Sequence, residues 1–96
     1  MQYGLNKKPA DWMLEMAKRH KMLRKQAGFT QRELARRAGV SLGSLKRFET
    51  SGQISIQSLF LLIDVLGRID DFDTILKPIE NMKEIERLFS DKKRRI

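Results

Sequence analysis

The stretch FTQRELARRAGVSLGSLKRFE, residues 29–49, decides the fold of this 96-residue chain. Thr30 is followed three residues later by a glutamate, which forms a T-x-x-E capping box and predicts the start of a helix. Gly39 ends that helix, and Ser41 is the expected N-cap of a second one. Alanine and glycine at the junction let two helix backbones approach closely. The stretch therefore predicts two short helices that cross around a tight turn.

Apolar spacing indicates which sides of these two helices face the core. Recurrence at three and four residues is typical of a buried helical face. The predicted inward residues are Leu34, Ala35 and Ala38 in the first helix, and Val40, Leu45 and Phe48 around the second. Gly43 lies on the outward side of the second helix, although glycine inside a helix costs about 1 kcal/mol relative to alanine.

Helices are predicted on both sides of this stretch, and no segment reads as a strand. Asp11 is the expected cap of a helix over residues 12–26, with Pro9 before it. A later helix begins at Ser55 or Ile56 and ends at Gly67. It is apolar nearly all round, so we expect it to be the core helix. After Glu49, the residues Thr50-Ser51-Gly52 are predicted as a turn.

The C-terminal third of the chain differs from the rest in its charge pattern and in its predicted structure. The acidic run DDFDTIL, residues 70–76, predicts a short helix or turn. An amphipathic helix is expected after it, with apolar residues at Ile79, Met82, Ile85, Leu88 and Phe89. The final DKKRRI, residues 91–96, is predicted to be disordered. We thus expect an N-terminal arm (1–10), one helical domain (11–77), and an amphipathic segment with a basic tail (78–96).

Positive charge is concentrated in the front half of the chain. The whole sequence has 20 Lys/Arg against 12 Asp/Glu, a net charge of +8. Residues 1–55 hold 12 basic and 4 acidic residues, residues 56–80 hold 2 and 5, and residues 81–96 hold 6 and 3. This uneven distribution indicates a polyanion-binding face at the front and a different role for the acidic segment.

Composition argues against several classes of protein. The chain has no cysteine, which excludes disulfides and thiolate metal sites. Its single histidine, His20, lies on the apolar stripe of the first helix with no carboxylate at a ligand spacing, so it is predicted to be a packing residue. With no glycine-rich phosphate loop either, we expect no enzyme, metal site or cofactor. No apolar run is long enough to span a membrane and the N-terminus lacks a secretory signal, so we expect a cytoplasmic protein.

The sequence resembles the Cro- and phage-repressor-type helix-turn-helix family, also called the Xre family. The matching motifs are TQRELARRAGVS at residues 30–41, SLKRFE at 44–49 and ISIQSLFLLIDVLG at 54–67, and the resemblance extends over residues 16–76. It implies an all-α, five-helix, lambda-repressor-like domain, to which the C-terminal amphipathic segment is an extension. The implied function is repression of transcription by a homodimer bound to an inverted repeat in double-stranded DNA. Residues 68–76 and 79–89 are the candidate dimer surfaces.

The resemblance also implies roles for individual residues. The expected base-reading positions are Ser41, Leu42, Gly43, Lys46 and Arg47. Lys46 or Arg47 is the best candidate for a guanine contact, and Leu42 either reads a thymine methyl group or packs against a partner. Gly43 is expected to let the helix lie deep in the major groove of the DNA. The alternative is that glycine at this surface position has no functional role.

Phosphate contacts and one structural contact complete the expected site. The predicted phosphate-binding residues are Thr30, Gln31, Arg32, Arg36 and Ser44, which position the protein without reading sequence. Arg24 and Glu49 are expected to form an ion pair between the ends of the first and third helices.

A narrower resemblance concerns residues 41–76, which are similar to the HipB-like antitoxins that accompany HipA-like kinase toxins. It implies an autoregulating antitoxin in the bacterial cytoplasm, associated with the nucleoid and able to bind a HipA-like kinase. The alternatives are a stand-alone phage- or operon-type repressor, and a protein whose main task is to hold a partner while it binds DNA weakly.

Overall fold

The computed structural model describes the backbone of residues 7–95 and the side chains of residues 7–90. Its elements are α1 (Pro9–Gln26), α2 (Gln31–Ala38), α3 (Leu42–Ser51), α4 (Ile56–Val65), the 3-10 helix η1 (Ile69–Thr74) and α5 (Met82–Arg95). The described residues contain no strand, so the predicted all-α class is confirmed. Residues 1–6 of the expected N-terminal arm lie outside the described residues.

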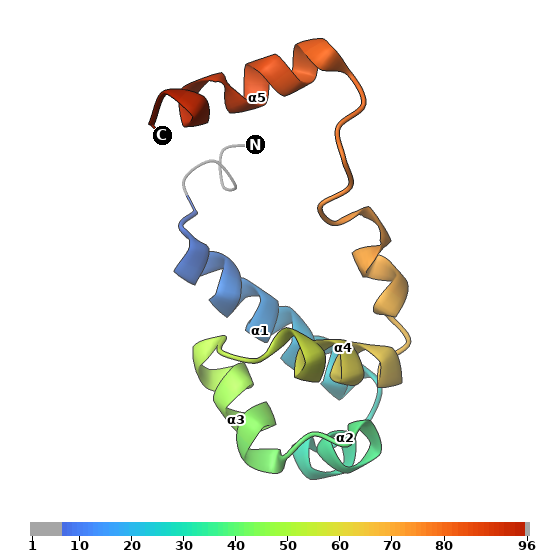
Figure 1. Cartoon of the computed structure of the whole chain (residues 1–96). Helices are drawn as coiled ribbons and strands as arrows, with labels where there is room; N and C mark the ends of the chain where they lie inside the picture. The colour runs from blue at the N-terminus through green and yellow to red at the C-terminus, as the bar shows by residue number, and fades with distance from the viewer. Residues whose placement is uncertain (1–6, 96) are drawn as a thin grey trace.

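Figure 1 shows α1 to α4 gathered in one body, with η1 at its edge. An extended segment after η1 leads to α5, which stands apart from that body. The first four helices and η1 make up the predicted five-helix domain, and α5 is the C-terminal extension.

Short-range capping explains why the helices begin where they do. The Thr30 hydroxyl accepts a hydrogen bond from the Glu33 backbone N–H at 3.1 Å. Ser41 and Ser55 cap α3 and α4 in the same way, each through the backbone N–H three residues later. Gly39 ends α2 with a φ of 71°, the left-handed conformation that favours glycine. These local signals are confirmed as predicted.

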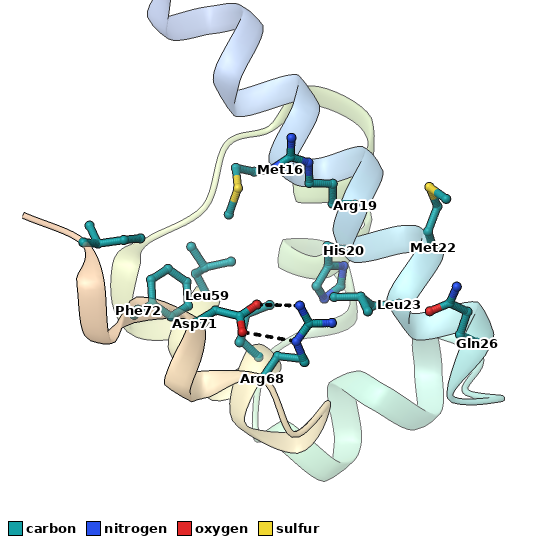
Figure 2. A pocket seen from close by; sticks show the side chains of 12 residues that line it. Met16, Arg19, His20, Met22, Leu23, Gln26, Leu59, Arg68, Asp71 and Phe72 are labelled. Atoms are coloured by element: carbon teal, nitrogen blue, oxygen red, sulfur yellow. Dashed lines mark hydrogen bonds and ion pairs between the residues drawn. The ribbon is translucent and has the colours of Figure 1, made fainter. Parts of the chain in front are cut away.

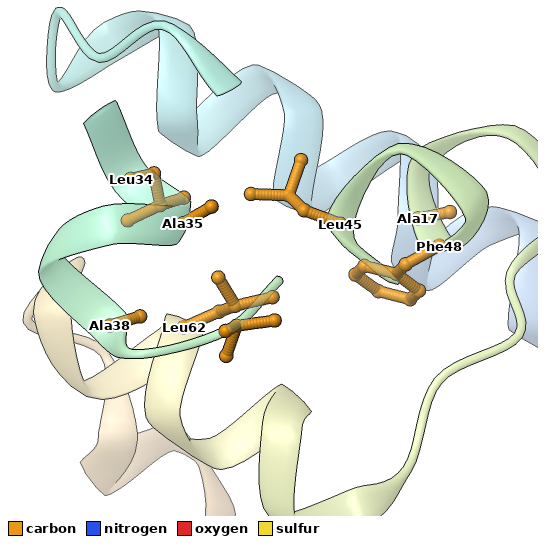
Figure 3. Packing of buried hydrophobic residues seen from close by; sticks show 8 residues of the cluster. Ala17, Leu34, Ala35, Ala38, Leu45, Phe48 and Leu62 are labelled. Carbon is orange, nitrogen blue, oxygen red and sulfur yellow. The ribbon is translucent and has the colours of Figure 1, made fainter. Parts of the chain in front are cut away.

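The core lies where α2, α3 and α4 meet beneath α1. Figure 3 shows Leu34 and Ala35 of α2 facing Leu45 of α3, with Leu62 of α4 closing the cluster from the other side. All the inward residues predicted for α2 and α3 are buried. Because Ala35 and Ala38 are small, α2 can approach its neighbours closely.

Two helix boundaries differ from the prediction. α1 begins at Pro9 rather than after Asp11, because proline lacks an N–H and suits the first turn of a helix. Asp11 lies in that first turn, where its carboxylate accepts a hydrogen bond from the Lys8 N–H at 2.9 Å. At the other end of the chain, the residues predicted to be disordered continue α5 as far as Arg95.

The turn predicted after Glu49 is also wrong, because α3 continues through Ser51. The helix therefore includes two more residues, Thr50 and Ser51, whose hydroxyls donate to the carbonyls four residues earlier. Gly52 then ends it with a φ of 81°. A Cβ atom on Gly52 would lie 2.7 Å from the backbone carbon and oxygen of Met13, so this glycine lets α3 touch α1.

Only one side of α4 packs in the core. Leu62 and Ile63 are buried, whereas Ile56, Phe60 and Leu61 are exposed. The apolar sequence is correct for the inner side. On the outer side Phe60 meets Phe72 of η1, with ring centroids 4.7 Å apart, but this contact leaves all three side chains exposed. The molecule therefore carries apolar surface on α4 that the sequence alone assigned to the core.

Candidate nucleic-acid interface

The basic side chains singled out in the sequence lie on the outer sides of α2 and α3. Arg32 and Arg36 are exposed and one helical turn apart on α2, while the intervening Leu34 is buried. Lys46 and Arg47 are exposed on α3, between the buried Leu45 and Phe48. The core thus fixes which way both helices turn, and it directs these cations to solvent.

The start of α3 is held by its own serines. The Ser41 hydroxyl accepts a hydrogen bond from the Ser44 N–H at 3.1 Å and donates to the Ser44 Oγ at 2.8 Å. Both residues are exposed. The capping interaction fixes their hydroxyls at the front of α3, where base-reading and phosphate contacts are expected.

Two of the remaining base-reading candidates differ in their surroundings. Leu42 is half-buried and packs against the core cluster, so only part of its side chain is open to DNA or to a partner. Its side chain serves folding because α3 turns it toward the domain. Gly43 is exposed, has an ordinary φ, and a Cβ atom there would meet nothing within 4 Å. The fold therefore does not require glycine at position 43.

Arg47 is oriented by Gln53, a residue for which no local sequence pattern predicts a role. Its guanidinium donates a hydrogen bond to the Gln53 side-chain oxygen. These two residues line a shallow hollow of about 290 Å³ together with Ser44, Ile54, Ser55 and Ser58. The hollow joins the front of α4 to the outer face of α3. Of its lining residues, Ser44 and Arg47 were predicted site residues and Ser55 a predicted helix start, whereas no local pattern indicated a role for Gln53.

The predicted phosphate contacts at the start of α2 are partly engaged within the protein. The Thr30 hydroxyl donates to Glu33 Oε1 at 3.1 Å while it caps the helix. Gln31 is half-buried, and its side-chain amide donates to Glu49 Oε1 at 3.0 Å. An amide has two N–H donors, so this bond uses one of them and orients the group.

Glu49 is the centre of a buried polar network that joins three helices. Arg24 donates to it twice, from Nε to Oε2 at 2.9 Å and from Nη2 to Oε1 at 3.0 Å. Gln31 of α2 adds the bond described above. Arg24 also donates to the Phe29 carbonyl at 2.8 Å, which ties down the loop before α2. The ion pair between Arg24 and Glu49 is thus present and nearly out of reach of water.

His20 is a member of this network, which sequence reasoning missed. Its Nδ1 lies 2.8 Å from Glu49 Oε2, and because a carboxylate accepts, Nδ1 carries the hydrogen. The ring also packs edge-on against Phe48, with centroids 5.1 Å apart. The packing role is therefore right, but the absence of a carboxylate partner is wrong, because that partner comes from a helix far away in sequence.

Burial and hydrogen bonding shift two pKa values in this network. Burial lowers the pKa of His20, and the attraction of Glu49 offsets this only in part. Burial alone would raise the pKa of Glu49, but the hydrogen bonds from Arg24 and Gln31 outweigh it and leave that pKa below its usual value. At neutral pH the network therefore consists of a charged carboxylate, a charged guanidinium and a neutral imidazole.

Neither a metal-binding cluster nor a membrane-spanning helix is present in the part of the chain that the structure describes. No group of three or more His, Cys, Asp or Glu residues there could hold a metal ion. No helix within residues 7–95 is long and apolar enough to cross a membrane.

One comparison with known proteins gives a match. A family model described as "Helix-turn-helix" matches residues 21–72, more than half of the chain. The match begins in α1, contains α2, α3 and α4, and ends within η1. No curated protein and no solved structure matches the chain.

Proposed function

The chain belongs to the helix-turn-helix family of DNA-binding transcription regulators, and we propose that it is a repressor that binds a specific inverted repeat in double-stranded DNA as a homodimer. The observation that carries this proposal is the exposure of Arg32, Arg36, Lys46 and Arg47 on the outer sides of the two motif helices. Surface cations on α2 and α3 provide the phosphate-binding charge that nucleic-acid affinity requires.

The two helices are assigned different tasks. On α2, Arg32 and Arg36 neutralise phosphates and position the domain, with help from Thr30 and Gln31. On α3, Lys46 and Arg47 address base edges in the major groove, where the guanidinium fork can bond both acceptors of a guanine. Ser41, Gly43 and Ser44 bring the start of α3 close to the DNA. Leu42 is left with a supporting role, since it packs against the core.

The test is a binding titration of the purified full chain on a labelled duplex from the DNA upstream of its own gene. We expect affinity to fall steeply between about 50 and 200 mM salt, because phosphate binding releases counterions. Arg32→Ala should weaken binding to all sequences and lower the salt slope by about one unit. Arg47→Ala should cost roughly 1–3 kcal/mol and relax base preference at one position of each half-site.

A matched control is Lys77→Ala, which also removes one exposed positive charge but lies after η1. It should leave the salt slope within error of the unchanged protein. Affinity that does not change with salt, or equal effects of Arg32→Ala and Lys77→Ala, would contradict the proposed DNA-binding face.

We further propose that the operator is the protein's own promoter and that the chain is the antitoxin of a HipA-like kinase. The resemblance of residues 41–76 to HipB-like antitoxins supports this role. In that case the protein is bound to DNA in the bacterial nucleoid for part of its time. The alternative, a stand-alone repressor, makes the same DNA contacts without a kinase.

Co-expression with the product of the adjacent gene separates these two possibilities. A HipA-like kinase that co-purifies with the chain, and whose toxicity the chain suppresses, supports the antitoxin role. A neighbour unrelated to kinases, or a kinase that does not bind, leaves a stand-alone repressor. If the kinase binds while operator affinity is no higher than for random DNA, the chain acts chiefly as an interaction protein.

A further inference from the structure

Arg47 differs from the other cations of the proposed DNA-binding face because a neighbour holds its side chain. Its guanidinium Nη2 donates to Oε1 of Gln53, which lies in the loop between α3 and α4. The other three cations of this face have no hydrogen bond or ion pair from their side chains within the described part of the chain: Arg32, Arg36 and Lys46. Arg47 is therefore the cation whose direction is set before DNA binds.

The loop that carries Gln53 is tied to the same turn of α3. The Ser51 hydroxyl donates to the Arg47 carbonyl at 2.7 Å and accepts from the Gln53 N–H at 3.2 Å. Together with the side-chain contact, these bonds close a ring that runs from Arg47 through Ser51 to Gln53 and back. Gly52 touches the backbone of Met13, which fixes the loop against α1. Gln53 is thus held in place beside the Arg47 side chain.

The acceptor that Arg47 uses is neutral, whereas other arginines of the chain use carboxylates. Figure 2 shows the contrast at Arg68, which forms two bonds with the Asp71 carboxylate, at 2.9 and 3.2 Å. A carboxylate holds a guanidinium strongly, but it also cancels the charge and occupies the donor fork. Among the described residues, the further arginines with a side-chain acceptor also have a carboxylate: Arg19 with Glu15, Arg24 with Glu49 and Arg87 with Glu84. Gln53 instead orients Arg47 and leaves its charge uncancelled.

This contact leaves most of the Arg47 guanidinium available to a ligand. Arginine has five N–H donors, and Gln53 takes one of them, so four remain. Guanine presents two acceptors in the major groove, O6 and N7, which need two N–H groups. Both Arg47 and Gln53 are exposed and line the same shallow hollow, so DNA can reach them. Arg47 can therefore bond both acceptors of a guanine while it stays on Gln53.

We propose that Gln53 is a positioning residue for base recognition, which holds the Arg47 guanidinium in one direction so that it bonds a guanine edge and does not follow other bases or phosphates. Ordering a long side chain on binding costs affinity, and a contact already formed in the free protein removes part of that cost. The benefit is confined to the sequence in which Arg47 finds its guanine. Gln53 therefore raises discrimination between sequences rather than affinity for DNA in general. The inference rests on the proposed function, in which Arg47 reads a base.

The test compares the unchanged full chain with Gln53→Ala on two duplexes. One is the sequence selected from random DNA, and the other has a substitution at the base pair where Arg47→Ala loses its preference. We expect Gln53→Ala to reduce the ratio of the two dissociation constants by about 2- to 10-fold, the factor that ordering one long side chain corresponds to. Affinity for random DNA and its salt slope should not change, because no charge is altered. An unchanged ratio overturns the positioning role, and so does an equal loss of affinity for every sequence.

A double-mutant cycle shows whether Gln53 acts through Arg47. In a chain that already carries Arg47→Ala, adding Gln53→Ala should have no further effect on binding to the selected sequence. If Gln53→Ala weakens binding equally with and without the Arg47 side chain, Gln53 contacts DNA by itself and the positioning role is wrong.

Gln57→Ala is the matched control. Gln57 is also an exposed glutamine, four residues further along at the start of α4, and it does not line the hollow. It should leave the ratio of dissociation constants unchanged. A loss of discrimination equal to that of Gln53→Ala would show that the effect does not come from the contact with Arg47. Circular dichroism checks that each variant is folded, which we expect because both glutamines are exposed.

A second readout needs no DNA. NMR relaxation of the Arg47 side-chain Nε measures how strongly the guanidinium is ordered on the picosecond to nanosecond timescale. The order should fall in Gln53→Ala and persist in Gln53→Glu, because a carboxylate is still an acceptor. Equal order in the unchanged chain and Gln53→Ala overturns the proposal, and so does its loss in Gln53→Glu.

Gln53→Glu also shows why the acceptor is neutral. Its carboxylate adds a negative charge beside the phosphates, so it should weaken binding to all sequences although Arg47 stays ordered. Undiminished affinity in Gln53→Glu would contradict the argument from charge. If the unchanged chain selects no specific sequence, that result contradicts the proposed function, while the relaxation measurement still decides whether Gln53 holds Arg47.

Discussion

Replacing Glu49 with alanine should be among the most destabilising changes in this protein. The carboxylate accepts hydrogen bonds from His20, Arg24 and Gln31, which lie on α1 and α2. Removing it leaves a buried guanidinium without its counter-ion and a buried imidazole without its acceptor. The loss of one partner from a buried ion pair costs about 3–5 kcal/mol, far more than an exposed pair contributes.

The assay is urea unfolding followed by circular dichroism at neutral pH. A domain of this size has a total stability of about 5–15 kcal/mol, so the change removes a large part of it. With a urea slope of about 1–2 kcal/mol per molar, a loss of about 3–5 kcal/mol should lower the midpoint by about 1.5–5 M. Operator affinity should fall as well, because Gln31 loses the contact that orients it.

Glu15→Ala is the control, because Glu15 also contacts two cations, Lys7 at 3.4 Å and Arg19 at 3.1 Å. The Glu15 side chain is 28% exposed, whereas that of Glu49 is 3% exposed. The control should shift the urea midpoint far less than Glu49→Ala does, because an ion pair in contact with solvent contributes little to stability. If Glu49→Ala were equally mild, the network would not hold the three helices together and the reasoning from burial would be refuted.

Three further predictions concern the pH dependence of stability and two of the glycines. Because the pKa of His20 and that of Glu49 are both lowered in the folded state, the unfolded chain takes up protons first, so stability should decline as pH falls below about 6.5 and again below about 4.5. Urea midpoints measured across this range should show the decline below about pH 6.5 in the unchanged protein but not in His20→Asn, which keeps a donor near Glu49. If His20→Asn shows the same decline, another group titrates in this range. Gly52→Ala should cost at least about 1–3 kcal/mol, since its φ is 81° and its Cβ would meet the Met13 backbone. Gly43→Ala should instead stabilise the fold by up to about 1 kcal/mol and weaken operator binding; unchanged affinity in the titration would mean that Gly43 is incidental.

Features with local causes were predictable from the sequence. Thr30, Ser41 and Ser55 cap helices through backbone groups three residues away, so their roles appear within a short window of sequence. The buried faces of α2 and α3 follow from helical spacing in the same way. The contact between Arg24 and Glu49 came from the resemblance rather than from any local pattern.

Features that depend on distant partners were missed. His20 meets Glu49 across 29 residues, and Gly52 meets the backbone of Met13, so neither role is visible from neighbouring residues. The exposed side of α4 was missed for a related reason. An apolar helix shows that it packs against something, but its sequence does not indicate whether that partner belongs to the same chain.

Selection of bound sequences from a pool of random DNA duplexes, with the purified full chain, shows directly whether α3 reads a specific inverted repeat. We expect enrichment of two symmetric half-sites. Their centres should lie about 10 base pairs apart, which is one helical turn, or a multiple of that distance. The same selection with Arg47→Ala should lose the preference at one position of each half-site while the spacing persists. A pool with no enriched sequence would mean that the protein does not read a specific site. An enriched sequence that is unaffected by Arg47→Ala and Lys46→Ala together would mean that α3 does not read it through these side chains.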